Sequence, residues 1–204
     1  MTKQIVVLIS GSGSNLQALI DAQQQGSLGG HISLVVSNKK SAYGLTRAAN
    51  ADIPTTVRTL KEYRDAGKSR EEFDRDLAEF IASDYAPDLI VLAGWMHILS
   101  PAFIDRFRGR IINLHPALPG ELDGAHAIDR AYDEFKAGSR SRTGVMVHYV
   151  IPEVDKGAPI LVEEIPCKEG DSQEDLENRI HAVEHHILPK AVKLVLSGNV
   201  KSSE

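Results

Sequence analysis

Cysteine is nearly absent from this chain of 204 residues, whose single cysteine is Cys167. One cysteine cannot close a disulfide within the chain, so no disulfide framework is expected. Long apolar runs are also lacking, because no stretch approaches the ~18 consecutive apolar residues that cross a bilayer. Residues 1–3 lead directly into a short apolar run rather than the longer one of a signal peptide. These absences favour a cytoplasmic protein with no membrane partner.

An excess of positive charge is missing too, since the formal net charge is -5. Acidic and basic residues are interspersed, and the sequence predicts no basic surface for nucleic acid or for an anionic membrane. We therefore expect small-molecule partners and no nucleic acid. The composition does not distinguish a monomer from a homodimer.

The composition that is present is typical of a globular protein with one core, with 42% hydrophobic and 25% charged residues. No internal repeat, low-complexity linker or shift in composition divides the chain. We expect a single domain over residues 1–200 and a short disordered tail over 201–204.

Short β-branched apolar runs alternate with longer amphipathic segments in the first hundred residues. Ile5–Ile9 precedes a helical pattern over Leu16–Gln24, and Ile32–Val36 precedes another over Ala42–Ala51. A further run, Leu89–Ala93, is apolar at every position, as in a central strand. This alternation is typical of a parallel sheet covered by helices.

Capping signals indicate where further helices begin. Ser69 and Glu72 have capping-box spacing and predict a helix through Ile81, while Ser100-Pro101 predicts a short helix before a strand at Ile111-Ile112. The remaining pattern predicts a helix over Ala127–Lys136, a hairpin of Val145–Ile151 with Ile160–Glu163, and a long helix after Ser172 that Pro189 kinks or splits. The predicted fold is α/β, with a doubly wound, mostly parallel sheet flanked by helices and an antiparallel hairpin at one edge.

A glycine-rich loop over Ser10–Asn15 lies between the first strand and the first helix. Glycines let the backbone approach an anion, and the amides at a helix N-terminus point toward it, so the loop favours phosphate binding. A dinucleotide fingerprint would need glycine at Leu16 and an acidic residue within Ser37–Lys40, and neither is present. A P-loop is excluded because no Gly-Lys-Ser/Thr follows.

Two alternatives for the glycine loop stay open. It is a plain tight turn if the side chain of Ser14 or Asn15 caps the helix. Lys39 and Lys40 keep an NADP-dependent dehydrogenase as a minor alternative.

An amide and an imidazole follow the strand at Ile111-Ile112, in the segment Asn113-Leu114-His115-Pro116. Asn113 and His115 are two positions apart, so on an extended chain their side chains point to the same face. Both can donate to an oxyanion formed during acyl transfer. A structural role for His115 remains an equal alternative.

Asp155 lies in the predicted hairpin turn, within Glu153–Gly157, where Asp and Gly are also favoured for backbone reasons alone. If its carboxylate lies near His115, its charge is expected to raise the histidine pKa above about 6.5.

Five segments closely resemble the phosphoribosylglycinamide formyltransferases, in that family's order and spacing, over residues 5 to about 189. They are Ile5–Ala22, Val91–Met96, Asn113–Pro119, Val147–Val150 with Val154-Asp155, and Gly170–Ser172. The resemblance implies direct transfer of formyl from 10-formyltetrahydrofolate to the amine of glycinamide ribonucleotide, in purine biosynthesis and without a metal.

The resemblance also implies roles for particular residues. Asn113 and His115 would polarise the formyl oxygen, His115 would be the general acid, and Asp155 would hold His115 and an ordered water. The nucleotide would be bound by Gly11, Ser12, Gly13, Ser14, Asn15, His181 and Glu184. The folate would be bound by Arg70, Trp95, Met96, His97, Ile98, Leu99, Asn113, Ile151, Pro152, Glu153, Val154 and Asp155.

Three positions depart from the family pattern. His97 stands where many relatives carry Arg, and His181 stands where some carry Gln. The loop over residues 119–123 keeps the family's length with a different sequence. The first departure bears on folate contacts, the second on substrate contacts and the third on the shape of the loop.

Other readings of single motifs compete with this one. His181, Glu184 and His185 match the spacing of the zinc ligands and catalytic glutamate of inverted zinc peptidases. Cys167 has no neighbouring base in the sequence that would make it a nucleophile. His148 lies on a predicted strand, where a structural role is expected. Methionyl-tRNA formyltransferases are disfavoured by the acidic charge and by the lack of an additional C-terminal domain. Formyltetrahydrofolate hydrolases are disfavoured because no regulatory domain precedes the first strand, and a non-catalytic folate or nucleotide binding module remains an alternative.

Overall fold

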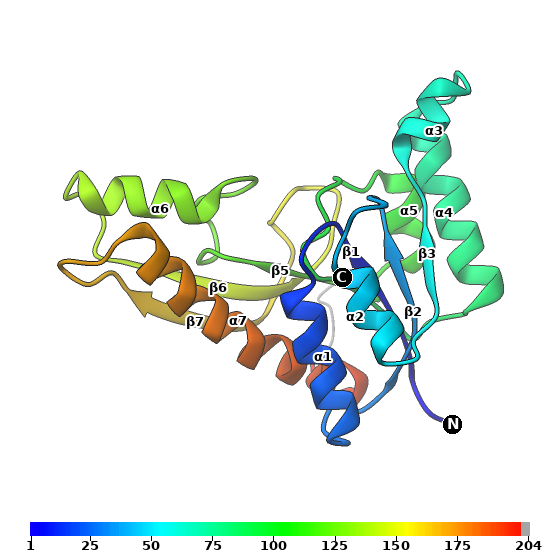
Figure 1. The fold of residues 1–204 in the computed structure, drawn as a ribbon, viewed down its shortest axis with the longest axis horizontal. Coiled ribbons are helices and arrows are strands. Elements are labelled where there is room, and N and C mark those ends of the chain that lie inside the picture. The colour runs from blue at the N-terminus through cyan, green and yellow to red at the C-terminus, as the bar shows by residue number, and fades with distance from the viewer. Residues whose placement is uncertain (201–204) are drawn as a thin grey trace.

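A seven-stranded sheet in the order β3-β2-β1-β4-β5-β6-β7 runs through the molecule (Figure 1). The computed structural model describes residues 1–200, so the tail predicted over 201–204 lies outside the described residues. The strands are β1 (Gln4–Ile9), β2 (His31–Ser37), β3 (Thr55–Val57), β4 (Leu89–Leu92), β5 (Ile111–His115), β6 (Arg142–Tyr149) and β7 (Pro159–Pro166). Strands β1 to β5 are parallel, and β6 and β7 each run antiparallel to the strand before them.

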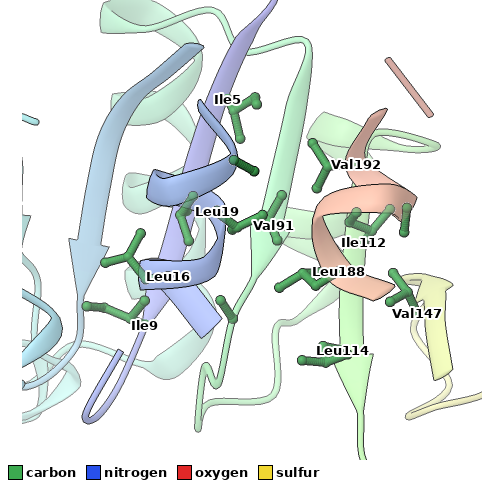
Figure 2. Packing of buried hydrophobic residues seen from close by; sticks show 14 of the residues in the cluster. Ile5, Ile9, Leu16, Leu19, Val91, Ile112, Leu114, Val147, Leu188 and Val192 are labelled. Atoms are coloured by element: carbon green, nitrogen blue, oxygen red, sulfur yellow. The ribbon is translucent and has the colours of Figure 1, made fainter. Parts of the chain in front are cut away.

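Helices cover both faces of the sheet. They are α1 (Ser14–Gln24), α2 (Gly44–Asn50), α3 (Leu60–Asp65), α4 (Arg70–Asp84), α5 (Pro101–Ile104), the 3-10 helix η1 (Asp105–Phe107), α6 (Ala127–Lys136) and α7 (Gln173–Leu196). Figure 2 shows α1 and α7 side by side on one face, over β1, β4 and β5. The opposite face is covered by α4, α5 and η1, whose Phe73, Phe103 and Phe107 are buried there.

Strand β1 contributes to both cores, which explains why it is apolar at nearly every position. Ile5, Val7 and Ile9 pack under α1 and α7, whereas Val6 and Leu8 pack under α4 and α5. Successive side chains of a strand point to opposite faces, so a strand covered on both sides needs a continuous apolar run. The predicted fold class, with its mostly parallel sheet and edge hairpin, is confirmed.

The structure adds elements that the sequence pattern did not show and lengthens the hairpin. β3 is a three-residue strand at the edge of the sheet, and α3 has no buried residue, so neither has an apolar periodicity to detect. The hairpin strands span residues 142–149 and 159–166, so the first begins three residues before its predicted start and ends two residues before its predicted end, and the second extends beyond both predicted bounds. Polar residues such as Arg142 and Glu164 extend its ladder through backbone hydrogen bonds, which need no apolar side chain.

The expected split at Pro189 is wrong, because α7 is a single helix of 24 residues that contains this proline. Buried residues lie on both sides of it, including Ile187, Leu188, Ala191 and Val192. Packing of this apolar stripe against the sheet stabilises the helix despite the backbone hydrogen bond that proline cannot donate.

Replacing this proline should therefore stabilise the protein. Pro189→Ala is expected to raise the free energy of unfolding by roughly 1–3 kcal/mol, because it restores an N–H donor and removes a ring that crowds the preceding turn. Urea unfolding measures the change, with Ala182→Gly, on an exposed position of the same helix, as a control that should be destabilising. A Pro189→Ala protein no more stable than the wild type would show that α7 accommodates the ring without strain.

Candidate active site

The carboxyl ends of β1, β4 and β5 meet at one edge of the sheet, since these neighbouring strands are parallel. The glycine loop follows β1, residues 93–100 follow β4, and Asn113 and His115 end β5. The connection between β6 and β7, which carries Asp155, starts beside Ile112 because β6 is antiparallel to β5, and it folds back so that Asp155 reaches Asn113 and His115. Open α/β sheets bind ligands at this kind of edge.

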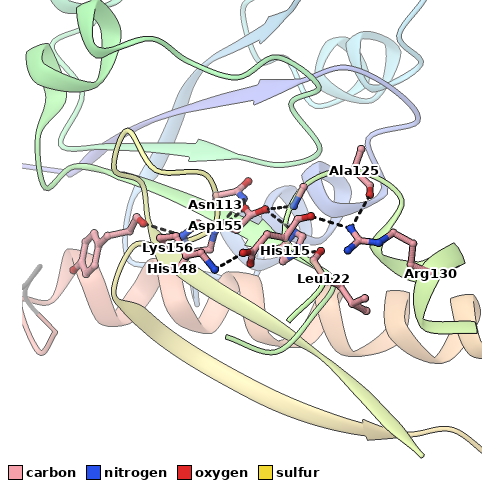
Figure 3. A network of polar contacts seen from close by, with 11 residues as sticks. Asn113, His115, Leu122, Ala125, Arg130, His148, Asp155 and Lys156 are labelled. Atoms are coloured by element: carbon pink, nitrogen blue, oxygen red, sulfur yellow. Dashed lines mark hydrogen bonds and ion pairs between the residues drawn. The ribbon is translucent and has the colours of Figure 1, made fainter. Parts of the chain in front are cut away.

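Asn113, His115 and Asp155 lie together at this edge (Figure 3). The Nδ2 atom of Asn113 donates to Oδ1 of Asp155 over 3.4 Å, and Nδ1 of His115 lies 3.5 Å from Oδ2 of Asp155. The side chains of His115 and Asp155 are 6% and 8% exposed. The structure thus joins the three residues predicted as the catalytic set in one buried polar cluster.

His148 also belongs to this cluster, although its spacing suggested only a structural residue. Its Nδ1 donates to the carbonyl oxygen of Tyr149 over 2.8 Å, so Nε2 of the neutral ring carries a lone pair. That atom accepts a hydrogen bond from Nδ2 of Asn113 at 3.1 Å and lies 3.5 Å from Oδ1 of Asp155. The missing signal was strand register, because β5 and β6 pair Asn113 directly with His148.

The loop between β5 and α6 closes over the cluster from the other side, as Figure 3 shows. The carbonyl oxygen of Leu122 lies 3.2 Å from Nε2 of His115, and the backbone N–H of Gly124 donates to Oδ2 of Asp155 over 2.8 Å. An ion pair between Lys156 and Asp123 joins this loop to the segment that carries Asp155. Both nitrogens of His115 therefore face protein oxygens, and a neutral ring can donate to only one of them.

Burial lowers the pKa of His115, and this outweighs the opposing effect of the Asp155 charge and of the Leu122 carbonyl. The expectation that Asp155 raises this pKa above its usual value is therefore wrong in its net direction, because the sequence pattern did not reveal how deeply the ring is buried. Burial acts to raise the pKa of Asp155, but the neighbouring imidazoles of His148 and His115 and the hydrogen bond from the Gly124 N–H hold it below its usual value.

The glycine loop forms the N-terminus of α1 without help from a side chain. Gly13 is the N-cap residue, in a left-handed conformation with φ of 73°, and no side chain caps the helix. The alternative of a turn capped by Ser14 or Asn15 is therefore wrong. The first amides of α1 have no side-chain acceptor, which leaves them available to an anion.

Asn15 and Glu184 meet across 169 positions of sequence, where α1 packs on α7. Nδ2 of Asn15 donates to Oε2 of Glu184 over 3.1 Å. Glu184 is 5% exposed, and burial raises its pKa. His181 lies one turn earlier on the same helix, with its side chain 38% exposed, so three of the predicted nucleotide-binding residues lie on adjoining helices.

The predicted folate-binding segment after β4 alternates between the core and solvent. Trp95 and Leu99 are buried, whereas Met96 and Ile98 are 74% and 56% exposed. Ile151 and Val154, in the connection after β6, are also exposed large apolar residues. Pro152 and Glu153 lie exposed beside them, and Arg70 is exposed at the start of α4. The side chain of His97 instead turns inward, with its Nε2 atom 2.7 Å from Asp74.

Among residues 1–200, no three His, Cys, Asp or Glu side chains are grouped as a metal ion would require. Glu184, the acidic residue of the zinc-like spacing, is instead hydrogen-bonded to Asn15. In the same part of the chain, no helix has the length and apolar character to cross a membrane.

A mostly parallel sheet with a buried amide, imidazole and carboxylate at its carboxyl edge defines an α/β protein equipped for acyl transfer without a protein nucleophile. Comparison with known proteins agrees, since residues 3–192 match the formyl transferase family. The chain belongs to this family.

Two curated relatives and one solved structure match this chain over 90% or more of their own length. The chain is 50% identical to the phosphoribosylglycinamide formyltransferase of Schizosaccharomyces pombe, over 98% of this chain and 100% of the relative. It is 42% identical to that of Escherichia coli, over 98% and 90%. The solved structure of the phosphoribosylglycinamide formyltransferase from Coxiella burnetii superposes with a TM-score of 0.90 and 40% identity, over 100% of this chain and 92% of that one.

Proposed function

We propose that the protein transfers the formyl group of 10-formyltetrahydrofolate to the amine of glycinamide ribonucleotide, giving the N-formyl product and tetrahydrofolate in purine biosynthesis. The observation that carries this proposal is the buried cluster of Asn113, His115 and Asp155 at the carboxyl edge of the sheet. The names of relatives at 42–50% identity supply the formyl acceptor, and membership of the formyl transferase family supports a folate as the formyl donor.

The uncapped start of α1 supports a phosphate site for the nucleotide, and the neighbouring Glu184 carboxylate is suited to accept hydrogen bonds from ribose hydroxyls. The exposed apolar side chains of Met96, Ile98, Ile151 and Val154 support a slot for the flat ring of the folate. The cluster on β5 lies next to β4 and β6, whose following segments carry these apolar side chains, and two strands from β1, which the glycine loop follows.

In the proposed reaction the substrate amine attacks the formyl carbon, and a tetrahedral intermediate with an oxyanion forms. N–H groups of Asn113 and His115 donate to this oxyanion. Because burial lowers the pKa of His115, the ring is mostly neutral at pH 7, so its single N–H must leave Leu122 or Asp155 to make this donation.

Collapse of the intermediate breaks the bond between the formyl carbon and N10 of the folate. The amine loses one proton and N10 gains one, so the reaction is balanced without a redox partner. The neutral His115 ring accepts the amine proton through water, the Asp155 carboxylate stabilises the imidazolium that forms, and His115 then delivers this proton to N10 and returns to its neutral form. No step requires a metal, so the proposed enzyme is metal-free.

The proposal is tested by incubating the purified protein with 10-formyltetrahydrofolate and glycinamide ribonucleotide in excess chelator. We expect N-formyl product and tetrahydrofolate in equal amounts, and no product when methionyl-tRNA replaces the nucleotide, because the net charge of -5 disfavours tRNA. Activity with methionyl-tRNA alone, or activity lost on chelation and restored by zinc, would contradict the proposal.

The phosphate site is best tested at Gly11. A Cβ at Gly13 would lie 2.6 Å from the Cα of Gly44, so a change there would disturb the loop itself. A Cβ at Gly11 meets nothing within 4 Å. Gly11→Val should therefore raise the KM for the nucleotide about tenfold or more, with the KM for the folate and the Tm nearly unchanged, because its side chain occupies space beside the amides that bind the anion.

A graded series controls this experiment. Gly11→Ala should have a smaller effect in the same direction. Equal increases in both KM values, or none in either, would count against a phosphate at this loop.

A further inference from the structure

Asp74 is a fully buried carboxylate that the proposed chemistry does not use. It lies on α4, below the segment of residues 94–100 that joins β4 to α5, and its exposure is 0%. Its Oδ1 atom lies 2.7 Å from Nε2 of His97, and its Oδ2 atom accepts the backbone N–H of Ser100 at 2.7 Å. Both oxygens of one carboxylate thus hold the same segment.

The segment is fixed at further points. The backbone N–H of Met96 donates over 2.7 Å to Oγ of Ser10, the first residue of the glycine loop. The His97 ring packs edge to face against Phe73 and Trp95, with ring centroids 5.4 and 6.1 Å apart. Its side chain is only 9% exposed.

This anchoring sets which side chains the segment presents to solvent. Trp95, His97 and Leu99 point inward, and Met96 and Ile98 point outward. A shift of one residue would exchange the two sets, as in any extended segment with alternating side chains. The contact between His97 and Asp74 lies at the centre of this alternation.

Apolar packing alone would not require a charge at position 74. A carboxylate taken out of water is unfavourable unless it is paired and hydrogen-bonded, and a well-packed apolar residue often stabilises a core as well. The carboxylate adds geometric specificity, because its two oxygens hold one ring nitrogen and one backbone amide in defined positions.

We propose that Asp74 and His97 are positioning residues for the folate: together they hold residues 94–100 in the register that turns Met96 and Ile98 toward the pterin. This rests on the proposed function, because it assumes that a folate binds this segment. In this proposal the His97 side chain acts by binding Asp74 and does not contact the folate directly.

The chain offers a direct optical probe of this segment. Trp95 is its only tryptophan, so intrinsic fluorescence reports the environment of a single side chain beside His97. Titration with tetrahydrofolate, which carries no formyl group to transfer, gives a dissociation constant that does not depend on turnover.

The test compares two substitutions at His97. His97→Phe keeps an aromatic ring against Phe73 and Trp95 but removes the donor to Asp74, and His97→Gln keeps a donor. We expect His97→Phe to weaken tetrahydrofolate binding and raise the folate KM about tenfold, with the nucleotide KM within twofold of the wild type. His97→Gln should restore most of the affinity. Glu79→Gln, on the exposed side of α4, is the matched control and should change neither constant.

Hydrogen exchange separates failure of this inference from failure of the proposed function. In His97→Phe the amides of Met96 and Ser100 should exchange faster, and the Trp95 emission should shift, whether or not the protein binds folate. Unchanged exchange and emission, or wild-type tetrahydrofolate affinity despite a lower Tm, would overturn the positioning role. A wild-type protein that binds no tetrahydrofolate would instead refute the proposed function.

Discussion

The burial of His115 beside Asp155 is the constraint on which the rest of the site depends. Removal from water disfavours the charged imidazole and lowers its pKa, while the carboxylate 3.5 Å away acts in the opposite direction. The net effect lowers the pKa and favours the neutral ring, which can accept a proton, while the carboxylate stabilises the imidazolium that then forms.

The fold meets this constraint by bringing two distant segments to one sheet edge. Parallel strands place His115 and Asn113 at the end of β5, the antiparallel β6 pairs His148 with Asn113, and the connection after β6 folds back to place Asp155 beside them. His148 then orients the amide of Asn113 through its single lone pair. The same edge carries the uncapped N-terminus of α1, so the proposed phosphate site and the proposed reacting groups share one sheet edge.

Much of this arrangement could be predicted from the sequence, because it depends on local patterns. The apolar run of β4, the capping box at Ser69 and the glycine loop each have a short-range physical cause. The roles of His148 and Asp74 could not be predicted in that way, since each depends on a partner 23 to 35 positions away. The net shift in the pKa of His115 was missed for a related reason. The burial of its ring depends on how the connection between β5 and α6, which carries Leu122, packs beside it, and no local sequence pattern reveals this packing.

The central claim is that the Asp155 charge opposes the burial of His115 and supports turnover. NMR titration of His115 in wild type and Asp155→Asn, combined with turnover, tests it most directly. The wild-type midpoint should lie below about 6.5. In Asp155→Asn the midpoint should fall further, because the negative charge that stabilises the imidazolium is gone. Turnover should fall on the order of a hundredfold to a thousandfold with folding intact. An unchanged titration with wild-type turnover would contradict the account and leave Asp155 as a turn residue.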